Sequence, residues 1–168
     1  MKVEEALRMA IEYEKHVRDV YNDARARATE AVGKKIFKFL AQEEQQHVAY
    51  LEDRLREWSR DGRLKLAELA TAVPPADMIK QGVTRIEAPL EKLDMRVEVD
   101  LLKRALEVEK RTKEFYEHMA ADLDGDGRRL FQRFLEIEEG HLTIVQAEID
   151  AVSGMGFWFD WQEFNLSA

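Results

Sequence analysis

The chain has 168 residues, a length that suits one domain able to bury a continuous core. Its 34 acidic residues outnumber its 26 lysines and arginines, giving a formal net charge of −8 without a basic stripe or tail, which argues against binding to nucleic acid. The absence of cysteine excludes disulfides, thiolate metal sites, thioether-linked haem and thiol catalysis.

The first residues, with Lys2, Glu4 and Glu5, are too charged for a signal peptide. No apolar run approaches the length needed to cross a membrane. The sequence therefore predicts a soluble, cytoplasmic protein without a membrane partner.

Apolar residues recur at alternating steps of three and four up to about residue 152, a spacing that predicts amphipathic helices. We expect an all-α fold in one domain spanning residues 1–168, with helices at about 2–31, 34–60, 96–123 and 127–152. Gly33 and residues 124–127 lie between consecutive helices, which predicts short turns and two antiparallel hairpins.

Residues 61–95 contain three prolines and predict a long crossover that joins the two hairpins into an antiparallel four-helix bundle. Pro75 could begin a short helix there, because proline suits a first helical turn. Residues 153–168 form an aromatic C-terminal tail, which we expect to fold back over the bundle or to pack in a homodimer interface.

Each of the four core-facing stripes contains a glutamate where a leucine would be expected: Glu14, Glu44, Glu109 and Glu138. A histidine follows two of these glutamates at the third position, giving the motifs Glu44-x-x-His47 and Glu138-x-x-His141. Glu43 and Glu139 lie beside these stripes, and we expect neither of them to face the core.

The two halves of the chain repeat each other. Residues 10–21 match residues 105–116 at an offset of 95, and residues 36–51 match residues 130–145 at an offset of 94. The offset falls by one because the second hairpin turn is one residue shorter. The repeat predicts two pseudo-equivalent hairpins that face each other across a shared site.

Four buried carboxylates need compensating cations, since an unpaired buried carboxylate would instead take up a proton. A histidine three residues after a glutamate lies on the same helix face, so both side chains can reach one ion. Carboxylate and imidazole ligands suit iron or manganese, so we expect a di-metal centre. A single Glu-x-x-His motif on a charged helix favours a surface pair over a metal site. Two such motifs, in phase with two inward glutamates and with the repeat, favour metal.

Tyr21 and Tyr116 follow Glu14 and Glu109 by two helical turns. They are either core aromatic residues or donors that orient a ligand carboxylate, and both can be true.

With these residues in place, the chain resembles the ferritin-like superfamily, and most closely its rubrerythrin-type branch. The resemblance implies that Glu14, His47, Glu109 and His141 are terminal ligands. It also implies that Glu44 and Glu138 bridge two irons, and that Tyr21 and Tyr116 are the flanking tyrosines. Such proteins reduce hydrogen peroxide, oxidise ferrous iron with oxygen or peroxide, or store iron.

Two departures from rubrerythrins affect the prediction. The four-cysteine iron module is missing, so electrons would come from an external donor. Thr112 stands where rubrerythrins have a further glutamate, so the ligand set resembles the bacterioferritin type of centre. No methionine occupies a haem-ligating position, and we expect no haem.

The leading hypothesis is a non-haem di-iron oxidoreductase, a homodimer that reduces hydrogen peroxide or oxygen. One alternative is a ferroxidase or iron-storage protein. Another is a metal-free structural or interaction bundle.

Overall fold

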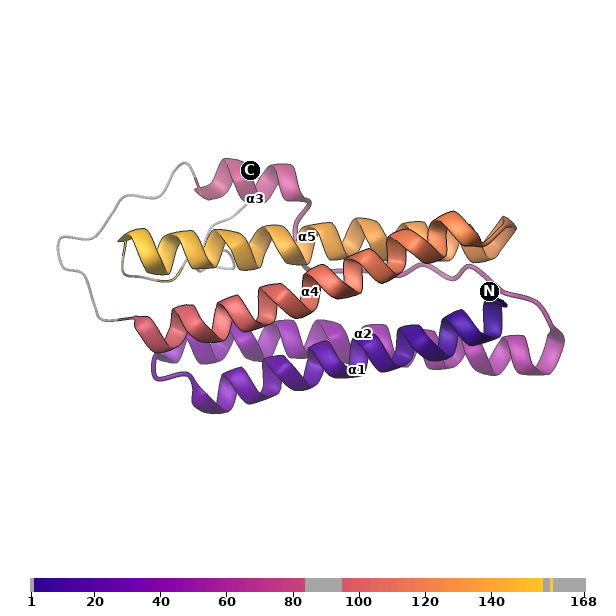
Figure 1. The fold of residues 1–168 in the computed structure, drawn as a ribbon, viewed down its shortest axis with the longest axis horizontal. Helices are drawn as coiled ribbons and strands as arrows, with labels where there is room; N and C mark the ends of the chain where they lie inside the picture. The colour runs from indigo at the N-terminus through magenta and orange to yellow at the C-terminus, as the bar shows by residue number, and fades with distance from the viewer. Residues whose placement is uncertain (1, 84–94, 156–157, 159–168) are drawn as a thin grey trace.

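The computed structural model describes residues 2–83, 95–155 and 158, and this part of the chain is all-α. The helices are α1 (Val3–Arg27), α2 (Ala31–Asp61), α3 (Ala76–Val83), α4 (Arg96–Asp122) and α5 (Gly125–Met155). Helix α1 packs on α2 and α4 packs on α5, while α1 also contacts α4 (Figure 1). The expected ferritin-like bundle of two helical hairpins is confirmed.

The crossover runs back along the bundle after α2 and leads into the short helix α3, which packs on α5 (Figure 1). Pro75 directly precedes α3, and its carbonyl oxygen accepts hydrogen bonds from the backbone N–H groups of Met78 and Ile79. Proline suits this position because its fixed φ matches the first turn of a helix.

The two hairpin turns differ by one residue, which accounts for the change in the repeat offset. Residues 28–30 connect α1 to α2, and residues 123–124 connect α4 to α5. Gly125 opens α5 at a φ of 55°, in the left-handed region that favours glycine. The second turn is therefore shorter than the expected turn at 124–127.

The expectation that Gly33 separates the first two helices is wrong, because Gly33 lies inside α2. The break is set by Glu98 of α4, whose Oε1 accepts hydrogen bonds from Thr29 N (2.7 Å), Thr29 Oγ1 (2.7 Å) and Glu30 N (3.2 Å). A buried carboxylate from another helix thus binds the N–H groups at the start of α2.

The absence of a side chain at Gly33 makes room for Trp158, the one residue after α5 that the structure describes; residues 153–155 of the expected tail are instead the end of α5. The Trp158 ring is 6% exposed and meets Phe37 edge-on, with the ring centroids 5.5 Å apart. At this residue the tail packs on the bundle. Residues 156–157 and 159–168 lie outside the described part, and the homodimer interface stays a prediction.

Two apolar clusters fill the bundle, one toward each end. The first includes Val17, Phe37 and Ile144, and the second includes Ile11, Leu51 and Phe134. In each long helix, the clustered apolar residues before the glutamate of the core-facing stripe belong to one cluster, and those after it belong to the other. The four glutamates therefore form a polar layer that divides the core.

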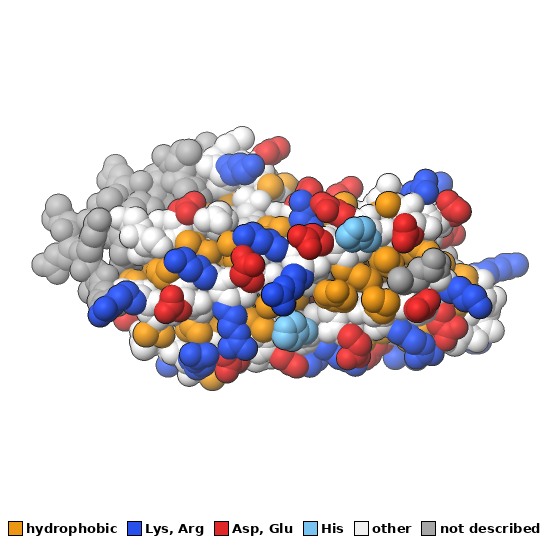
Figure 2. Space-filling model, viewed as in Figure 1, with side chains coloured by type: hydrophobic (Ala, Val, Ile, Leu, Met, Phe, Trp, Pro, Cys, Tyr) orange, Lys and Arg blue, Asp and Glu red, His pale blue; other side chains and the backbone are white. Residues whose placement is uncertain are grey.

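The surface carries both signs of charge. On the face shown in Figure 2, lysine and arginine side chains alternate with aspartate and glutamate, with apolar side chains between them. None of the described helices is long and apolar enough to span a membrane.

The contact between Gly33 and Trp158 gives a stability prediction. A Cβ at residue 33 would lie 2.5 Å from Trp158 Cζ2, so Gly33→Ala must displace the ring. We expect the free energy of unfolding to fall by about 1–3 kcal/mol, as in overpacked cores, despite the better helix propensity of alanine. Thermal unfolding and tryptophan emission measure this loss.

Gly154→Ala is the matched control, because a Cβ at this helical glycine meets nothing within 4 Å. It should leave stability equal or higher. Equal stability of the two variants would contradict the packing of Trp158 against Gly33.

Candidate metal centre

The polar layer brings together all six side chains that the sequence selects as metal ligands. Helix α1 supplies Glu14, α2 supplies Glu44 and His47, α4 supplies Glu109, and α5 supplies Glu138 and His141. Each of the six is 0% exposed. They converge because each lies on the apolar stripe of its helix, and the bundle turns all four stripes inward.

One group of ligand atoms surrounds His47. Its Nδ1 lies 3.1 Å from Glu14 Oε2, 3.2 Å from Glu44 Oε2 and 3.8 Å from Glu138 Oε1. Ligand atoms of these four residues all lie within 4.8 Å of one another, which is close enough to hold one metal ion.

A second group surrounds His141. Its Nδ1 lies 2.7 Å from Glu44 Oε1 and 3.7 Å from Glu109 Oε1, and these three residues also offer ligand atoms within 4.8 Å of one another. Glu44 belongs to both groups, with one oxygen toward each histidine. The two imidazole rings stack with their centroids 5.3 Å apart and their planes 15° from parallel. Glu138, the other expected bridge, belongs only to the group around His47.

The two tyrosines tie the hairpins together across the layer. The Tyr21 hydroxyl of α1 donates a hydrogen bond to Glu109 Oε1 of α4, and the Tyr116 hydroxyl of α4 donates one to Glu14 Oε1 of α1. Both side chains are 0% exposed. They are therefore core residues and also orient a carboxylate.

Burial and mutual repulsion change the proton affinities of the acids. Burial, followed by the charge of Glu44, raises the pKa of Glu14 to about 8. Burial and then the neighbouring Glu109 hold the pKa of Glu138 well above its ordinary value. Burial would raise the pKa of Glu44 too, but His141 and His47 outweigh it and hold that pKa well below its ordinary value.

The pKa values of both histidines are raised, whereas burial alone lowers the pKa of an imidazole. Burial alone would lower the pKa of His47, but Glu44 and Glu14 raise it to about 10. Burial is likewise outweighed at His141, where Glu44 leads the groups that hold its pKa well above the ordinary value. In the metal-free protein, protons on both imidazoles and on two carboxyls thus compensate the buried charge.

Many polar atoms of the layer have no hydrogen-bond partner among the described residues. They are both carboxylate oxygens of Glu44 and of Glu138, Glu109 Oε2, His47 Nε2, and both ring nitrogens of His141. Although His141 Nδ1 lies 2.7 Å from Glu44 Oε1, the pair does not have hydrogen-bond geometry. Buried polar atoms are nearly always paired, so this cluster fits a centre whose oxygens and imidazole nitrogens bind divalent cations.

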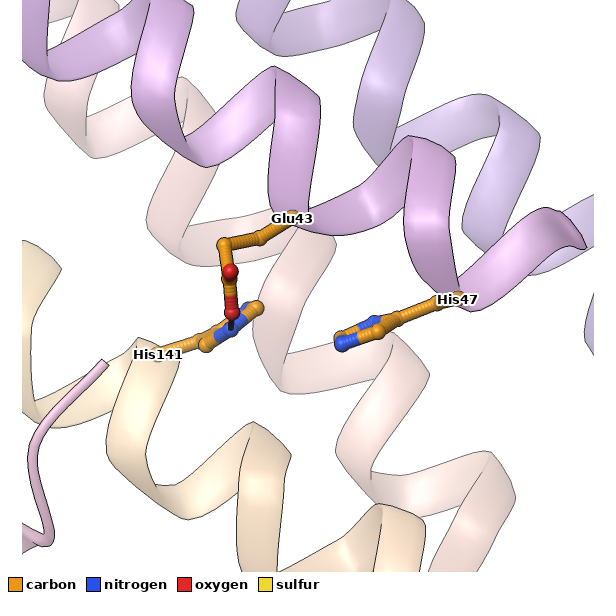
Figure 3. Close-up of side chains that lie close together, drawn as sticks. All are labelled: Glu43, His47 and His141. Carbon is orange, nitrogen blue, oxygen red and sulfur yellow. Dashed lines mark ion pairs between the residues drawn. The ribbon is translucent and has the colours of Figure 1, made fainter. Parts of the chain in front are cut away.

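Glu43 is the buried acid that the sequence did not select. We expected it beside the core with Glu139, and Glu139 is indeed exposed and lies 3.6 Å from Lys113 Nζ. Glu43 is only 3% exposed and extends from α2 toward His141 (Figure 3). Its Oε2 lies 3.9 Å from His141 Nε2, the ring nitrogen remote from Glu44. Thr71 of the crossover also contacts it, and no periodic pattern predicts where a crossover lies.

Thr112 adds no carboxylate to the layer. It is 0% exposed, and its hydroxyl donates a hydrogen bond to Val108 O of its own helix at 3.0 Å. This position of the centre therefore carries a satisfied neutral side chain.

The raised pKa values predict that the metal-free protein loses stability as pH rises from 6 to 9. The folded state keeps the His47 proton up to about pH 10, whereas the unfolded chain releases it near 6.5. Between pH 4.5 and about pH 8, the Glu14 carboxyl likewise keeps its proton in the folded state and releases it in the unfolded chain. Because the folded state binds more protons throughout this window, its stability falls with pH.

Thermal unfolding in the presence of a chelator measures this loss. Glu14→Gln cannot ionise at residue 14, so its melting temperature should fall less with pH. A saturating divalent metal should also reduce the fall, because the metal replaces the protons. A melting temperature that stays level or rises from pH 6 to 9 would contradict the assignment.

Comparison with known proteins agrees with this geometry. The model of the Rubrerythrin family matches residues 5–149, from the first turns of α1 well into α5, and so includes every residue of the two ligand groups. Neither the curated proteins nor the solved structures gave a match. The family match spans most of the chain, and the fold and the buried acid–histidine cluster of the chain agree with the match. The chain therefore belongs to the rubrerythrin family.

Proposed function

We propose that the protein is a non-haem di-iron oxidoreductase that reduces hydrogen peroxide or oxygen. The observation that carries the proposal is the pair of overlapping ligand groups that share Glu44, with buried atoms that lack hydrogen-bond partners. Membership of the rubrerythrin family supports iron as the metal. Manganese has the same ligand preferences.

In this proposal Glu14, His47, Glu109 and His141 would be terminal ligands, and Glu44 and Glu138 would be shared by the two ions. The two oxygens of Glu44 support a shared role, because one lies 3.2 Å from His47 Nδ1 and the other 2.7 Å from His141 Nδ1. When bound, two ferrous ions supply the two electrons that convert one molecule of hydrogen peroxide and two protons into two molecules of water.

The protein's own side chains fix the geometry around that chemistry. Tyr116 holds Glu14 Oε1 and leaves Oε2 facing His47, while Tyr21 holds Glu109 Oε1. The apolar clusters on both sides of the layer keep bulk water out, so these interactions act in a medium of low polarity.

Electrons to restore the ferrous state would come from an external donor, because a chain without cysteine cannot hold a thiolate-ligated iron. The homodimer remains a further prediction, which sedimentation would test.

A second candidate function uses the same centre, with ferrous iron as the substrate to be oxidised and stored. The observation that favours it is Thr112, which leaves the centre with four carboxylates and two imidazoles, as in the bacterioferritin type.

Removing the shared ligand should abolish the reaction. We expect Glu44→Ala to slow oxidation of the reduced, iron-loaded protein by peroxide by roughly 100-fold or more, the scale of loss when a metal site is disturbed. His141→Ala should have a similar effect. Stopped-flow absorbance under anaerobic conditions measures the rate.

Glu139→Ala is the matched control, since this exposed neighbour of Glu138 should leave the rate unchanged. The redox function would be rejected if peroxide oxidised the wild type no faster than Glu44→Ala. The metal-free structural bundle predicts that outcome, together with a stability unaffected by chelators.

Iron stoichiometry separates the two functions. An oxidoreductase should saturate at two irons per chain and consume peroxide repeatedly when a reductant is supplied. A storage protein should take up many irons per chain and sediment as a large assembly. Anaerobic iron titration and sedimentation velocity make both measurements, and anomalous scattering from a crystal would identify the bound element.

A further inference from the structure

Glu43 is buried, and residues of the crossover hold its carboxylate by hydrogen bonds. Its Oε2 accepts a hydrogen bond from Thr71 Oγ1 at 2.6 Å, and Ala72 N lies 3.3 Å from each of its two oxygens. Thr71 Oγ1 accepts in turn from Val73 N at 3.1 Å. The crossover thus fixes the direction of this carboxylate.

The direction is toward His141. Figure 3 shows the carboxylate approaching the edge of the His141 ring, and the separation of Glu43 Oε2 from His141 Nε2 is 3.9 Å. Because His141 Nδ1 faces Glu44 and Glu109, a metal bound at Nδ1 leaves the ring proton on Nε2. That N–H has no other partner among the described residues. A movement of about 1 Å brings it within hydrogen-bonding distance of Glu43.

His47 has no acid that close to its Nε2 among the described residues, although Glu43 offers an oxygen within 4.8 Å of one of the His47 ring nitrogens. The Nε2 of His47 is buried and unpaired in the described structure, and the edge of its ring meets Phe134 with the centroids 5.6 Å apart. At the repeat offset of 94, Ile137 is the counterpart of Glu43 (43 + 94 = 137). The two histidines therefore repeat in sequence, but the acid that faces one of them does not.

We propose that Glu43 is a positioning residue that accepts the Nε2–H hydrogen bond of His141 and so makes the two metal positions unequal. A carboxylate on the far nitrogen fixes the tautomer and makes the imidazole a stronger ligand, an effect usually worth 10–100-fold in metal affinity. The metal position formed by His141, Glu44 and Glu109 then binds its ion more tightly than the other metal position does. This inference rests on the proposed metal centre.

Stepwise binding of Co²⁺ to the metal-free protein tests the inference. Calorimetry and the visible absorption of the bound ion measure each step. The wild type should bind two equivalents in two resolved steps. Glu43→Gln keeps an oxygen for Thr71 and Ala72 but accepts poorly from an imidazole N–H. It should weaken the tight step by about 10-fold or more and leave the weak step within about 3-fold.

Thr71→Val separates positioning from a structural role, because it removes one contact between the crossover and Glu43 but keeps the carboxylate itself and its contacts with Ala72 N. It should lower the melting temperature while retaining two unequal steps. Ile137→Glu places an acid at the counterpart position and should tighten the weak step. Should that buried substitution prevent folding, the comparison of Glu43→Gln with Thr71→Val still decides the question.

Nitrogen-15 NMR of the Zn²⁺-loaded protein gives a second readout, independent of affinity. The Nε2 proton of His141 should be downfield and slow to exchange in the wild type, and should lose both properties in Glu43→Gln.

Three results would overturn the inference. They are two binding steps of equal affinity in the wild type, equal weakening of both steps in Glu43→Gln, and a wild type that binds a third equivalent of Co²⁺ which is all that Glu43→Gln loses. The last would make Glu43 a ligand, because Glu43, His47 and His141 also offer ligand atoms within 4.8 Å of one another. Failure of the wild type to bind Co²⁺ at all would count against the metal centre itself, so the two failures are distinguishable.

Discussion

Compensation of buried charge is the constraint on which the rest of this molecule depends. Four carboxylates lie 0% exposed between two apolar clusters, where an unpaired ionised acid would cost more than the whole stability of a typical domain. Protons on Glu14, Glu138 and the two imidazoles provide the compensation without metal. In the proposed metal-loaded centre cations would provide it, and folding and metal binding would then be coupled.

The geometry of the layer follows from the pairing of the hairpins. Each tyrosine donates its hydrogen bond to a carboxylate of the opposite hairpin, and Glu44 lies between the two histidines. An acid that accepts a hydrogen bond from a buried donor is oriented before it binds an ion and still has lone pairs for that ion. In the proposed centre the ligands would therefore be ordered before a metal binds, which would reduce the entropy lost on binding.

The sequence predicts the four helices and the residues of the layer well, because steps of three and four place a residue on a known face of a helix. It does not predict Glu43, since the burial of a residue beside the stripe depends on where the crossover packs. The same limit applies to the first hairpin turn. Glu98, on a helix that follows the crossover, binds Thr29 and Glu30 and sets where α2 begins, so Gly33 is not needed as a turn residue. Contacts between segments far apart in sequence leave no local pattern.

Each ligand group takes residues from both hairpins: Glu138 joins the group built around α1 and α2, and Glu44 joins the group around α4 and α5. If the two hairpins descend from one duplicated ancestral sequence, they have not been free to diverge independently. In the proposed centre, a substitution that shifts a ligand in one copy would also disturb the ion held mainly by the other copy. Selection therefore acts on the two copies as one unit, and differences such as Glu43 against Ile137 can accumulate only outside the shared ligands.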